Sequence, residues 1–190
     1  MKILLIGVCI AIAPCVAMAE NIPNANQWKY YISGNIGGVV SDVDIKDDSY
    51  LDFGGITTIE FGAQYNRYRL GLAWQSRAET SEILQVLIGH TASIKNDALR
   101  LNGYFDYIST EHFSMYVGAG LGVNRYDYTI QSRWPKYEES KHGASFIGGF
   151  STGMIFSGDH FGFDIGFIID YISYPRAYSY GPTIGLRYVF

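Results

Sequence analysis

Apolar residues alternate with polar or glycine residues along most of the chain, from about residue 28 to its end. In the stretch FGFDIGFIIDY, nearly every second side chain is aromatic or isoleucine, and glycine or aspartate mostly stands between them. A period of two residues is typical of a β-strand with one apolar face. The pattern predicts eight strands, at about residues 28–39, 58–65, 68–77, 99–107, 113–123, 144–156, 161–171 and 181–190.

The connections between these strands alternate in length. Short polar turns lie near residue 66 and at residues 109–112 and 157–160, whereas longer polar segments occupy residues 41–52, 78–97 and 127–143. Short turns on one side and long loops on the other are typical of outer-membrane barrels with both termini in the periplasm. We therefore expect the three long segments to be extracellular loops.

The predicted strands are about as long as a membrane-crossing strand, which needs roughly 9–11 residues when tilted. Backbone groups inside lipid must all be paired, so a sheet that crosses a membrane has to close on itself. The sequence therefore predicts an all-β fold: an eight-stranded antiparallel up-and-down transmembrane β-barrel. Aromatic residues near the ends of the strands fit the girdles that such barrels carry at both interfaces.

The N-terminal segment has the pattern of a secretory signal peptide. Lys2 precedes an apolar run that closes in Ala17-Met18-Ala19, a small-residue cleavage motif. We expect a cleaved signal peptide at residues 1–19 and a barrel domain at residues 20–190. Both cysteines lie in the leader, so the mature chain offers neither a disulfide nor a thiolate metal site.

Charge and hydropathy exclude other classes of protein. The net charge of −4 argues against nucleic acid as a partner and against a polybasic binder of membrane surfaces. No segment after residue 19 approaches the roughly 18 consecutive apolar residues that indicate a transmembrane helix. The class of protein that remains is an exported protein that crosses a membrane with β-strands.

The last eight residues, TIGLRYVF, resemble the assembly signal of outer-membrane barrels, in which Gly185, Tyr188 and Phe190 stand at the characteristic positions. Together with WKYYISGNIGGVVSD and YVGAGLGVNRY, they make residues 28–190 similar to the small eight-stranded outer-membrane barrels. This superfamily includes opacity proteins, the OmpA membrane domain and OmpX-like proteins. The resemblance implies an outer-membrane location with periplasmic termini, contact with outer-membrane lipid and lipopolysaccharide, and a barrel assembly machinery as a partner.

Strand alternation turns a set of charged residues toward the barrel interior. An eight-stranded barrel is just wide enough for side chains to fill it. Buried charges are normally paired, so we favour a structural polar network over a pore whose ion pairs exchange partners. The predicted interior set is Glu60, Arg69, Arg100, Asp106, Asp164, Asp170 and Arg187, with Tyr104 and Tyr116 beside them.

A lipid A-modifying enzyme is a third possibility, after a surface protein and a porin. Its candidates for a nucleophile, a base and an acid lie in YEESKHGAS, where Ser140, His142 and Ser145 follow two glutamates. Such groups must meet in space. The His-x-Ser pattern of deacylase barrels and the N-terminal helix of acyltransferase barrels are absent, and a charged run is usually a solvated loop. We therefore predict no catalytic, cofactor-binding or metal-binding residues.

The long segments are where a scaffold of this kind usually carries function. Arg125, Arg133 and Lys136 form a candidate rim for lipopolysaccharide phosphates, since cations make charge-assisted pairs with phosphate. By similarity to the opacity proteins, we expect an adhesin-like role at the cell surface, with a host surface, a matrix ligand or the envelope itself as the partner. The alternative is a small porin.

Overall fold

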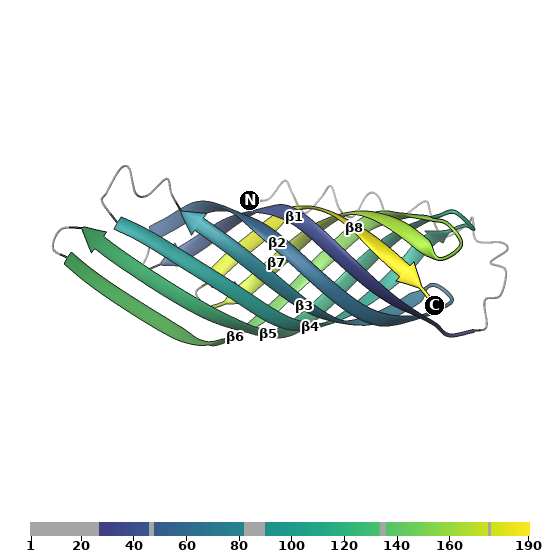
Figure 1. Cartoon of the computed structure of the whole chain (residues 1–190), viewed down its shortest axis with the longest axis horizontal. Helices are drawn as coiled ribbons and strands as arrows, with labels where there is room; N and C mark the ends of the chain where they lie inside the picture. The colour runs from purple at the N-terminus through teal and green to yellow at the C-terminus, as the bar shows by residue number, and fades with distance from the viewer. Residues whose placement is uncertain (1–26, 46–47, 82–89, 134–135, 175) are drawn as a thin grey trace.

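The computed structural model describes residues 27–45, 48–81, 90–133, 136–174 and 176–190, and it gives only the backbone in the outermost parts of three hairpins. Residues 1–19, the predicted signal peptide, lie outside these ranges. Eight strands form one closed barrel (Figure 1). The strands are β1 (Lys29–Ile45), β2 (Asp48–Tyr65), β3 (Tyr68–Ser81), β4 (His90–Ser109), β5 (Phe113–Arg133), β6 (Lys136–Ser157), β7 (Phe161–Ser173) and β8 (Arg176–Val189).

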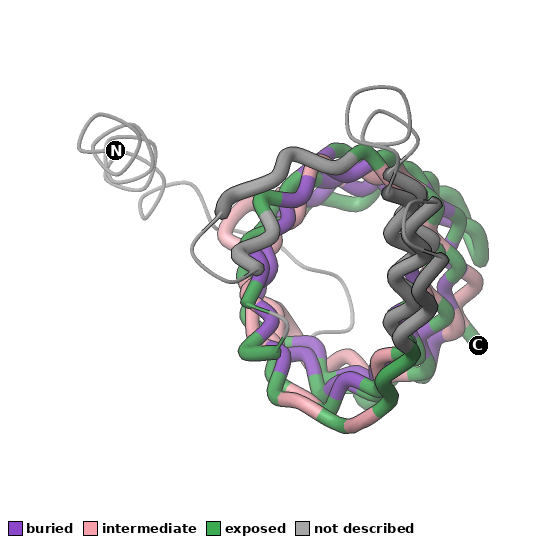
Figure 2. Tube along the Cα trace, turned by 90° about the vertical axis from the view of Figure 1, so that its left-hand side faces the viewer, coloured by how far each residue is buried: buried purple, intermediate pink, exposed green. Residues whose placement is uncertain are grey.

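Each strand pairs antiparallel with its neighbours in the chain, and β1 and β8 close the barrel. The prediction of an all-β, eight-stranded antiparallel up-and-down barrel is therefore confirmed. The two faces of the wall also follow the alternation. On β7, Phe161, Phe163 and Ile165 are exposed on the outside, while Asp164 and Asp170 are buried. Figure 2 looks along the barrel and shows buried and exposed positions alternating around the wall.

The strands are longer than the sequence pattern predicts, and the prediction of three long loops is wrong. β1 pairs with β2 as far as Ile45↔Asp48, and β5 pairs with β6 as far as Arg133↔Lys136. Most of residues 41–52, 78–97 and 127–143 is therefore strand. Both faces of a hairpin outside the membrane meet water, so apolar alternation is not needed there and no longer marks the strand. Residues 82–89 lie outside the described part.

At the end of the barrel opposite the short turns, which we call the hairpin end, the pairing between β2 and β3 and between β6 and β7 stops before the strands end. β2 and β3 pair only up to Gly54↔Glu79, and β6 and β7 pair only up to Ile147↔Ile172. Strands β3 to β6 therefore continue as a sheet of their own, and its β5–β6 hairpin extends well past the β7–β8 hairpin (Figure 1). We call β3–β6 beyond these two pairs the protruding sheet.

The opposite end of the barrel has short turns. Asn66 adopts a φ of 53°, in the left-handed region that asparagine tolerates better than most residues. The Gly158 N–H donates to the Phe161 carbonyl at 2.7 Å in another turn. The chain also ends here, where the Phe190 N–H donates to the Tyr30 carbonyl at 2.9 Å. Among the described residues, no helix is long and apolar enough to cross a membrane.

Candidate functional site

All seven charged residues of the predicted interior set are buried, and each is at most 7% exposed. The group of charged residues nearest the turn end connects β3, β4 and β5. The Arg69 Nη2 lies 2.7 Å from the Asp106 Oδ1, and the Arg69 Nε donates to the same oxygen at 3.1 Å. The Arg69 guanidinium also lies over two rings, 4.6 Å from the centroid of Tyr104 and 4.7 Å from that of Tyr116. Arg69 is therefore held by one carboxylate and two aromatic faces.

Glu60 lies at the centre of the interior and is held by neutral donors. The Tyr31 and Tyr104 hydroxyls each donate to its carboxylate at 2.7 Å, and the Asn102 Nδ2 donates at 2.7 Å. Among the described residues, no cation lies within ion-pair distance of this carboxylate. Hydrogen bonds to a charged acceptor are stronger than bonds between neutral groups. The three donors therefore replace the water that the Glu60 carboxylate loses on burial.

A second group of charged residues, nearer the hairpin end, is centred on Asp170 of β7. Its Oδ1 lies 2.8 Å from the Arg100 Nη1, and its Oδ2 pairs with Arg77. Gln75 links the two sides, because its Oε1 accepts from the Arg100 Nη1 at 3.0 Å. Arg77, at the end of a predicted strand, was not among the predicted interior residues. The alternation that places Arg69 inside, continued along the same strand, would have placed it there.

The remaining two charges, Arg187 and Asp164, do not pair with each other within 4.0 Å, since the ion pairs among the described residues involve other groups. The Arg187 guanidinium lies over the Tyr31 ring, 4.7 Å from the centroid. Asp164 accepts from the Tyr116 hydroxyl at 3.1 Å. Tyrosines thus stabilise buried charges that were expected to form ion pairs.

Glycines on β5 make room for this network. A Cβ at Gly118 would overlap the Tyr104 ring, and a Cβ at Gly120 would overlap the Asn102 amide. Tyr104 and Asn102 are two of the three side chains on β4 and β1 that donate to Glu60. A larger residue at either glycine would therefore displace a donor of the central carboxylate.

The described interior has cavities at two levels. A cavity of about 60 Å³ lies among the charged residues, room for only a few water molecules. Above Asp170, the buried side chains form an apolar cluster of Ala98, Ile147, Ile172 and Ala177. A wider cavity of about 340 Å³ opens at the turn end, where Lys29, Asp106 and Arg187 contribute to its lining.

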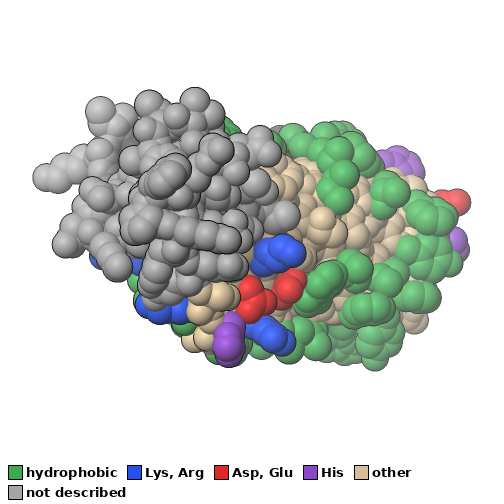
Figure 3. All heavy atoms as spheres, turned by 60° about the vertical axis from the view of Figure 1, so that its left-hand side comes forward, with side chains coloured by type: hydrophobic (Ala, Val, Ile, Leu, Met, Phe, Trp, Pro, Cys, Tyr) green, Lys and Arg blue, Asp and Glu red, His purple; other side chains and the backbone are tan. Residues whose placement is uncertain are grey.

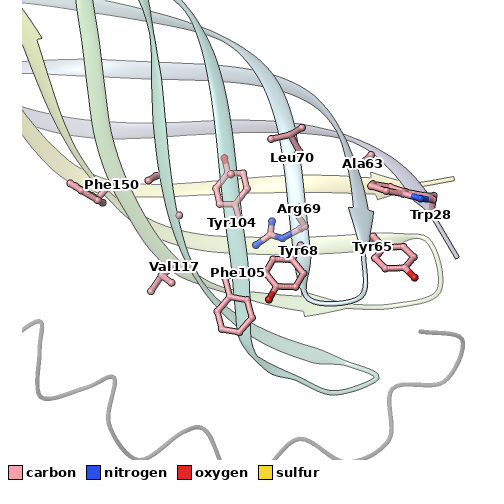
Figure 4. A pocket seen from close by; sticks show the side chains of 13 residues that line it. Trp28, Ala63, Tyr65, Tyr68, Arg69, Leu70, Tyr104, Phe105, Val117 and Phe150 are labelled. Carbon is pink, nitrogen blue, oxygen red and sulfur yellow. The ribbon is translucent and has the colours of Figure 1, made fainter. Parts of the chain in front are cut away.

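The outer surface carries an open groove of about 640 Å³ over β2 to β6 (Figure 4). Small residues create it, because Gly103 and Ala119 lie opposite each other between the larger Leu70 and Phe150 on the flanking strands. The Tyr68, Phe105 and Val117 side chains also line it. The groove lies on the apolar outer surface, where its shape and lining suit a hydrocarbon chain.

The candidate enzyme cluster is not assembled. His142 is exposed on the outer face of β6, while Ser145, three residues along the strand, lies on the other face and accepts from the Asn124 Nδ2 at 3.3 Å. Side chains three positions apart on a strand point to opposite faces. The His142 imidazole therefore has no access to the Ser145 hydroxyl. The two glutamates lie where only the backbone is described.

The three cations of the predicted lipopolysaccharide rim are not brought together. Arg125 is exposed on β5, opposite Asp97 of β4 and Ala144 of β6. Arg133 and Lys136 face each other at the far end of the hairpin. At a rise of roughly 3.3 Å per residue, Arg125 and Arg133 are about 26 Å apart along the strand.

Arg125 has charged neighbours at its own level. On the outer face, Asp97 lies opposite Arg125, and one pair further out Asp127 lies between Lys95 and His142. Figure 3 shows charged and histidine side chains between the hydrophobic surface of the barrel and the hairpin end. Because signs alternate here, this surface has mixed charge and not the cationic rim that was predicted. No group of three or more His, Cys, Asp or Glu in the described residues is placed to hold a metal ion.

The residues of the predicted assembly signal lie on β8 and at its end. Gly185 is buried against Asn35 of β1, where a Cβ would overlap the asparagine side chain. The Tyr188 ring packs against Phe161 and Phe190, with centroids 5.0 Å and 5.1 Å away. Phe190 is 70% exposed. The two aromatic residues are therefore part of an outward aromatic cluster at the turn end.

No protein-family model matches the sequence, and no curated protein sequence is significantly similar to it. Solved structures share its fold. Neisserial surface protein A superposes with a TM-score of 0.61 over 85% of this chain and 97% of that chain, at 15% identity. A major outer membrane protein from Thermus thermophilus gives 0.58 over 87% and 100%, at 10% identity.

A third solved structure is Ail, the attachment invasion locus protein of Yersinia pestis, in complex with the heparin analogue sucrose octasulfate. It superposes with a TM-score of 0.54 over 85% of this chain and 99% of that chain, at 16% identity. At these identities the likeness establishes the fold. The chain has the fold of small eight-stranded outer-membrane β-barrels, as the resemblance in its sequence implied.

Proposed function

We propose that the protein is an integral outer-membrane barrel that binds partners at the cell surface through its protruding sheet. The observation that carries this proposal is the continuation of β3–β6 past the points where β2 and β7 stop pairing with them. A barrel that only had to cross the membrane would not need this extension. The described strands contain up to 22 residues, against about 9–11 for a tilted crossing.

The outer surface supports the membrane location. Large apolar side chains stand exposed around the barrel, among them Leu72, Leu101, Leu121, Phe150 and Leu186. Aromatic rings pack in pairs at the turn end, such as Trp28 with Tyr65. An apolar band with aromatic girdles is the outer surface that lipid covers in such barrels. The turn end, with the C-terminus, would then face the periplasm, where the assembly machinery would meet Phe190.

The interior argues for a scaffold and against a porin. A conduit needs a continuous aqueous path, whereas the cavity among the buried charged residues of the described interior is only about 60 Å³. A buried apolar cluster that includes Ile147 and Ile172 lies beyond Asp170 on the side of the long hairpins. We expect purified protein in a planar lipid bilayer to give no discrete channels. Regular conductance steps that change when Asp170 is replaced by asparagine would favour the porin.

The protruding sheet is suited to recognition because its strands continue as a paired backbone ladder beyond the points where β2 and β7 stop pairing with them. The exposed residues just above the apolar surface include Lys95, Arg125, Asp127 and His142. Arg125 and Lys95 also lie next to the apolar surface, where they could bind phosphates of lipopolysaccharide. Of the three cations in the predicted rim, Arg125 therefore keeps its proposed role. A partner on a host surface or in a matrix would bind further out.

The test is a display experiment with one hairpin shortened. Tyr128 lies opposite Lys141, so an Asn-Gly turn between them can replace residues 129–140 without changing the register below. The matched control replaces residues 45–48 with the same turn, because Asp44 and Ser49 also form a pair. We expect cells displaying the first variant to lose binding to host cells and matrix, and cells displaying the control to keep it.

Both variants must be shown to assemble, which heat-modifiable gel mobility reports. Equal binding by the intact protein and the first variant would overturn the proposal. So would binding by neither the intact protein nor the control.

A further inference from the structure

One edge of the protruding sheet is open. β6 pairs with β5 from Lys136 to Ser157, but its pairing with β7 begins only at Ile147. In the part of the chain that the structure describes, no strand pairs with residues 136–146 on the side away from β5. An open edge presents N–H and C=O groups that are ready to pair with another strand.

The hydrogen bonds at the two ends of β6 show which residues present those groups. The Ser157 N–H donates to the His112 carbonyl, on the β5 side, and the Phe146 N–H donates to the Ser173 Oγ, on the β7 side. Backbone groups alternate sides along an antiparallel strand, and β6 has no register shift against β5. Lys136, Glu138, Ser140, His142 and Ala144 therefore direct their backbone groups to the open side.

The sequence of this edge is complementary to itself. If a second β6 runs antiparallel with Ser140 opposite Ser140, Glu138 faces His142 and Glu139 faces Lys141, each pair twice. Opposite charges that face each other across strands, as Glu139 and Lys141 do in this register, are stabilising, and like charges are destabilising. The neighbouring registers that keep the same hydrogen-bonding residues place Glu139 opposite itself, or Lys141 opposite itself. Charge therefore selects one register.

We propose that the β6 edge of one copy pairs antiparallel with the β6 edge of a second copy that is anchored in an opposing membrane. The orientation follows from the fold, because β6 strands in the same membrane descend in the same direction. Only a copy inverted across a gap between two membranes presents an antiparallel β6. The proposal rests on the proposed function, since it needs the hairpins to face outward.

The length of the open edge fits this pairing. In the selected register Lys136 lies opposite Ala144, so the paired segment ends next to Phe146, where Ser173 of β7 already occupies the edge. The segment thus fills the space between the end of the hairpin and the β7–β8 hairpin. The protein would link two cells, or two vesicles, by a continuous sheet.

The experiment uses the full mature barrel reconstituted in phosphatidylcholine vesicles, with aggregation followed by light scattering. Proline at position 142 removes an N–H from the open edge and none from the β5–β6 ladder, and edge strands tolerate proline. We expect His142→Pro to reduce aggregation at least tenfold and His142→Ala to stay within about twofold of the wild type. Gel mobility verifies that both variants fold.

A charge exchange tests the register. Glu139→Lys or Lys141→Glu alone places like charges opposite each other in every self-pair, so each variant should lose aggregation. Vesicles carrying one variant mixed with vesicles carrying the other should aggregate again, because the charges are then complementary. Aggregation by either variant alone at the wild-type level, or no recovery in the mixture, would overturn the proposal.

The two proposals fail separately. If wild-type vesicles do not aggregate while displaying cells still bind host cells, self-pairing is refuted and the surface-binding function stands. If vesicles aggregate through this edge but displaying cells bind no foreign surface, the partner of the sheet is another copy of the chain. Aggregation that His142→Pro leaves unchanged would place the contact elsewhere on the protein.

Discussion

The barrel wall and the protruding sheet are made of the same strands, but different forces maintain them. In the barrel, the inward face carries the buried network around Glu60 and Asp170, and the outward face exposes large apolar side chains. In the protruding sheet the strands continue as a paired backbone ladder, which between β5 and β6 reaches Arg133↔Lys136. We therefore expect the stability of the protein to be concentrated in the barrel.

The largest expected effect comes from removing the carboxylate of the group centred on Asp170. Asp170→Ala leaves Arg100 and Arg77 without the carboxylate they share, and breaking a buried ion pair in this way costs about 3–5 kcal/mol. We expect a loss of that size in urea unfolding of the protein in lipid vesicles, followed by tryptophan fluorescence. Asp170→Asn keeps the shape and an acceptor and should lose less. A loss below about 1 kcal/mol for Asp170→Ala would show that the network does not stabilise the barrel.

The next effect tests the outer surface. Leu121 is 59% exposed on β5, with Gly103 and Ala119 close by on the apolar surface. Lysine near the middle of a lipid-covered surface costs about 2–4 kcal/mol. We expect Leu121→Lys to lower the free energy of unfolding by that amount in vesicles. The same substitution should cost almost nothing if water covers this surface, and that outcome would contradict the membrane location.

A smaller effect is expected at the central carboxylate. Tyr104→Phe removes one of the three donors to Glu60, and a hydrogen bond to a charged group contributes about 1.5–3 kcal/mol. The unfolding free energy should fall by that amount, while Tyr180→Phe, on the outer face, serves as a control for the loss of a hydroxyl group. Equal losses in the two variants would mean that the Glu60 contacts contribute no specific stability.

The smallest effect is expected where the barrel wall meets the protruding sheet. Asp127 is exposed on β5 opposite Lys95 and His142. Surface substitutions away from buried features usually stay within about 0.5 kcal/mol. Asp127→Ala should therefore leave the unfolding free energy nearly unchanged, in contrast to Asp170→Ala on the buried side of the same wall. A loss above about 2 kcal/mol would show that the two regions are energetically one unit.

The same contrast explains how much the sequence reveals. Alternation identified all eight strands and turned Glu60, Asp106 and Arg187 inward, because lipid on one side and a packed interior on the other impose a period of two. It failed where both faces meet water, so residues 127–143 were expected to be a loop and are mostly strand.

The partners inside the barrel could not be predicted from the chain alone. Arg100 on β4 reaches Asp170 on β7, and Glu60 on β2 takes donors from β1 and β4. Such contacts cross the interior, and they depend on how far each strand is staggered when the sheet closes. Alternation predicts whether a residue faces inward or outward. The stagger of the strands decides which inward residues lie at the same height along the barrel axis and can meet. The pairing of the Arg, Asp and Glu residues that alternation places inside is therefore unknown until the stagger of the strands in the closed barrel is known.

The closing contact between β1 and β8 has a consequence for how the molecule is made. Ser41 and Ser179 share a hydrogen bond of 2.9 Å, and the N–H of Phe190 bonds to Tyr30. A ribosome releases Tyr30 long before it adds Phe190, so the sheet has two unpaired edges until β8 has been made. Closing a loop of this length is also entropically slow. The barrel can therefore close only once its last strand is present and β8 pairs with β1.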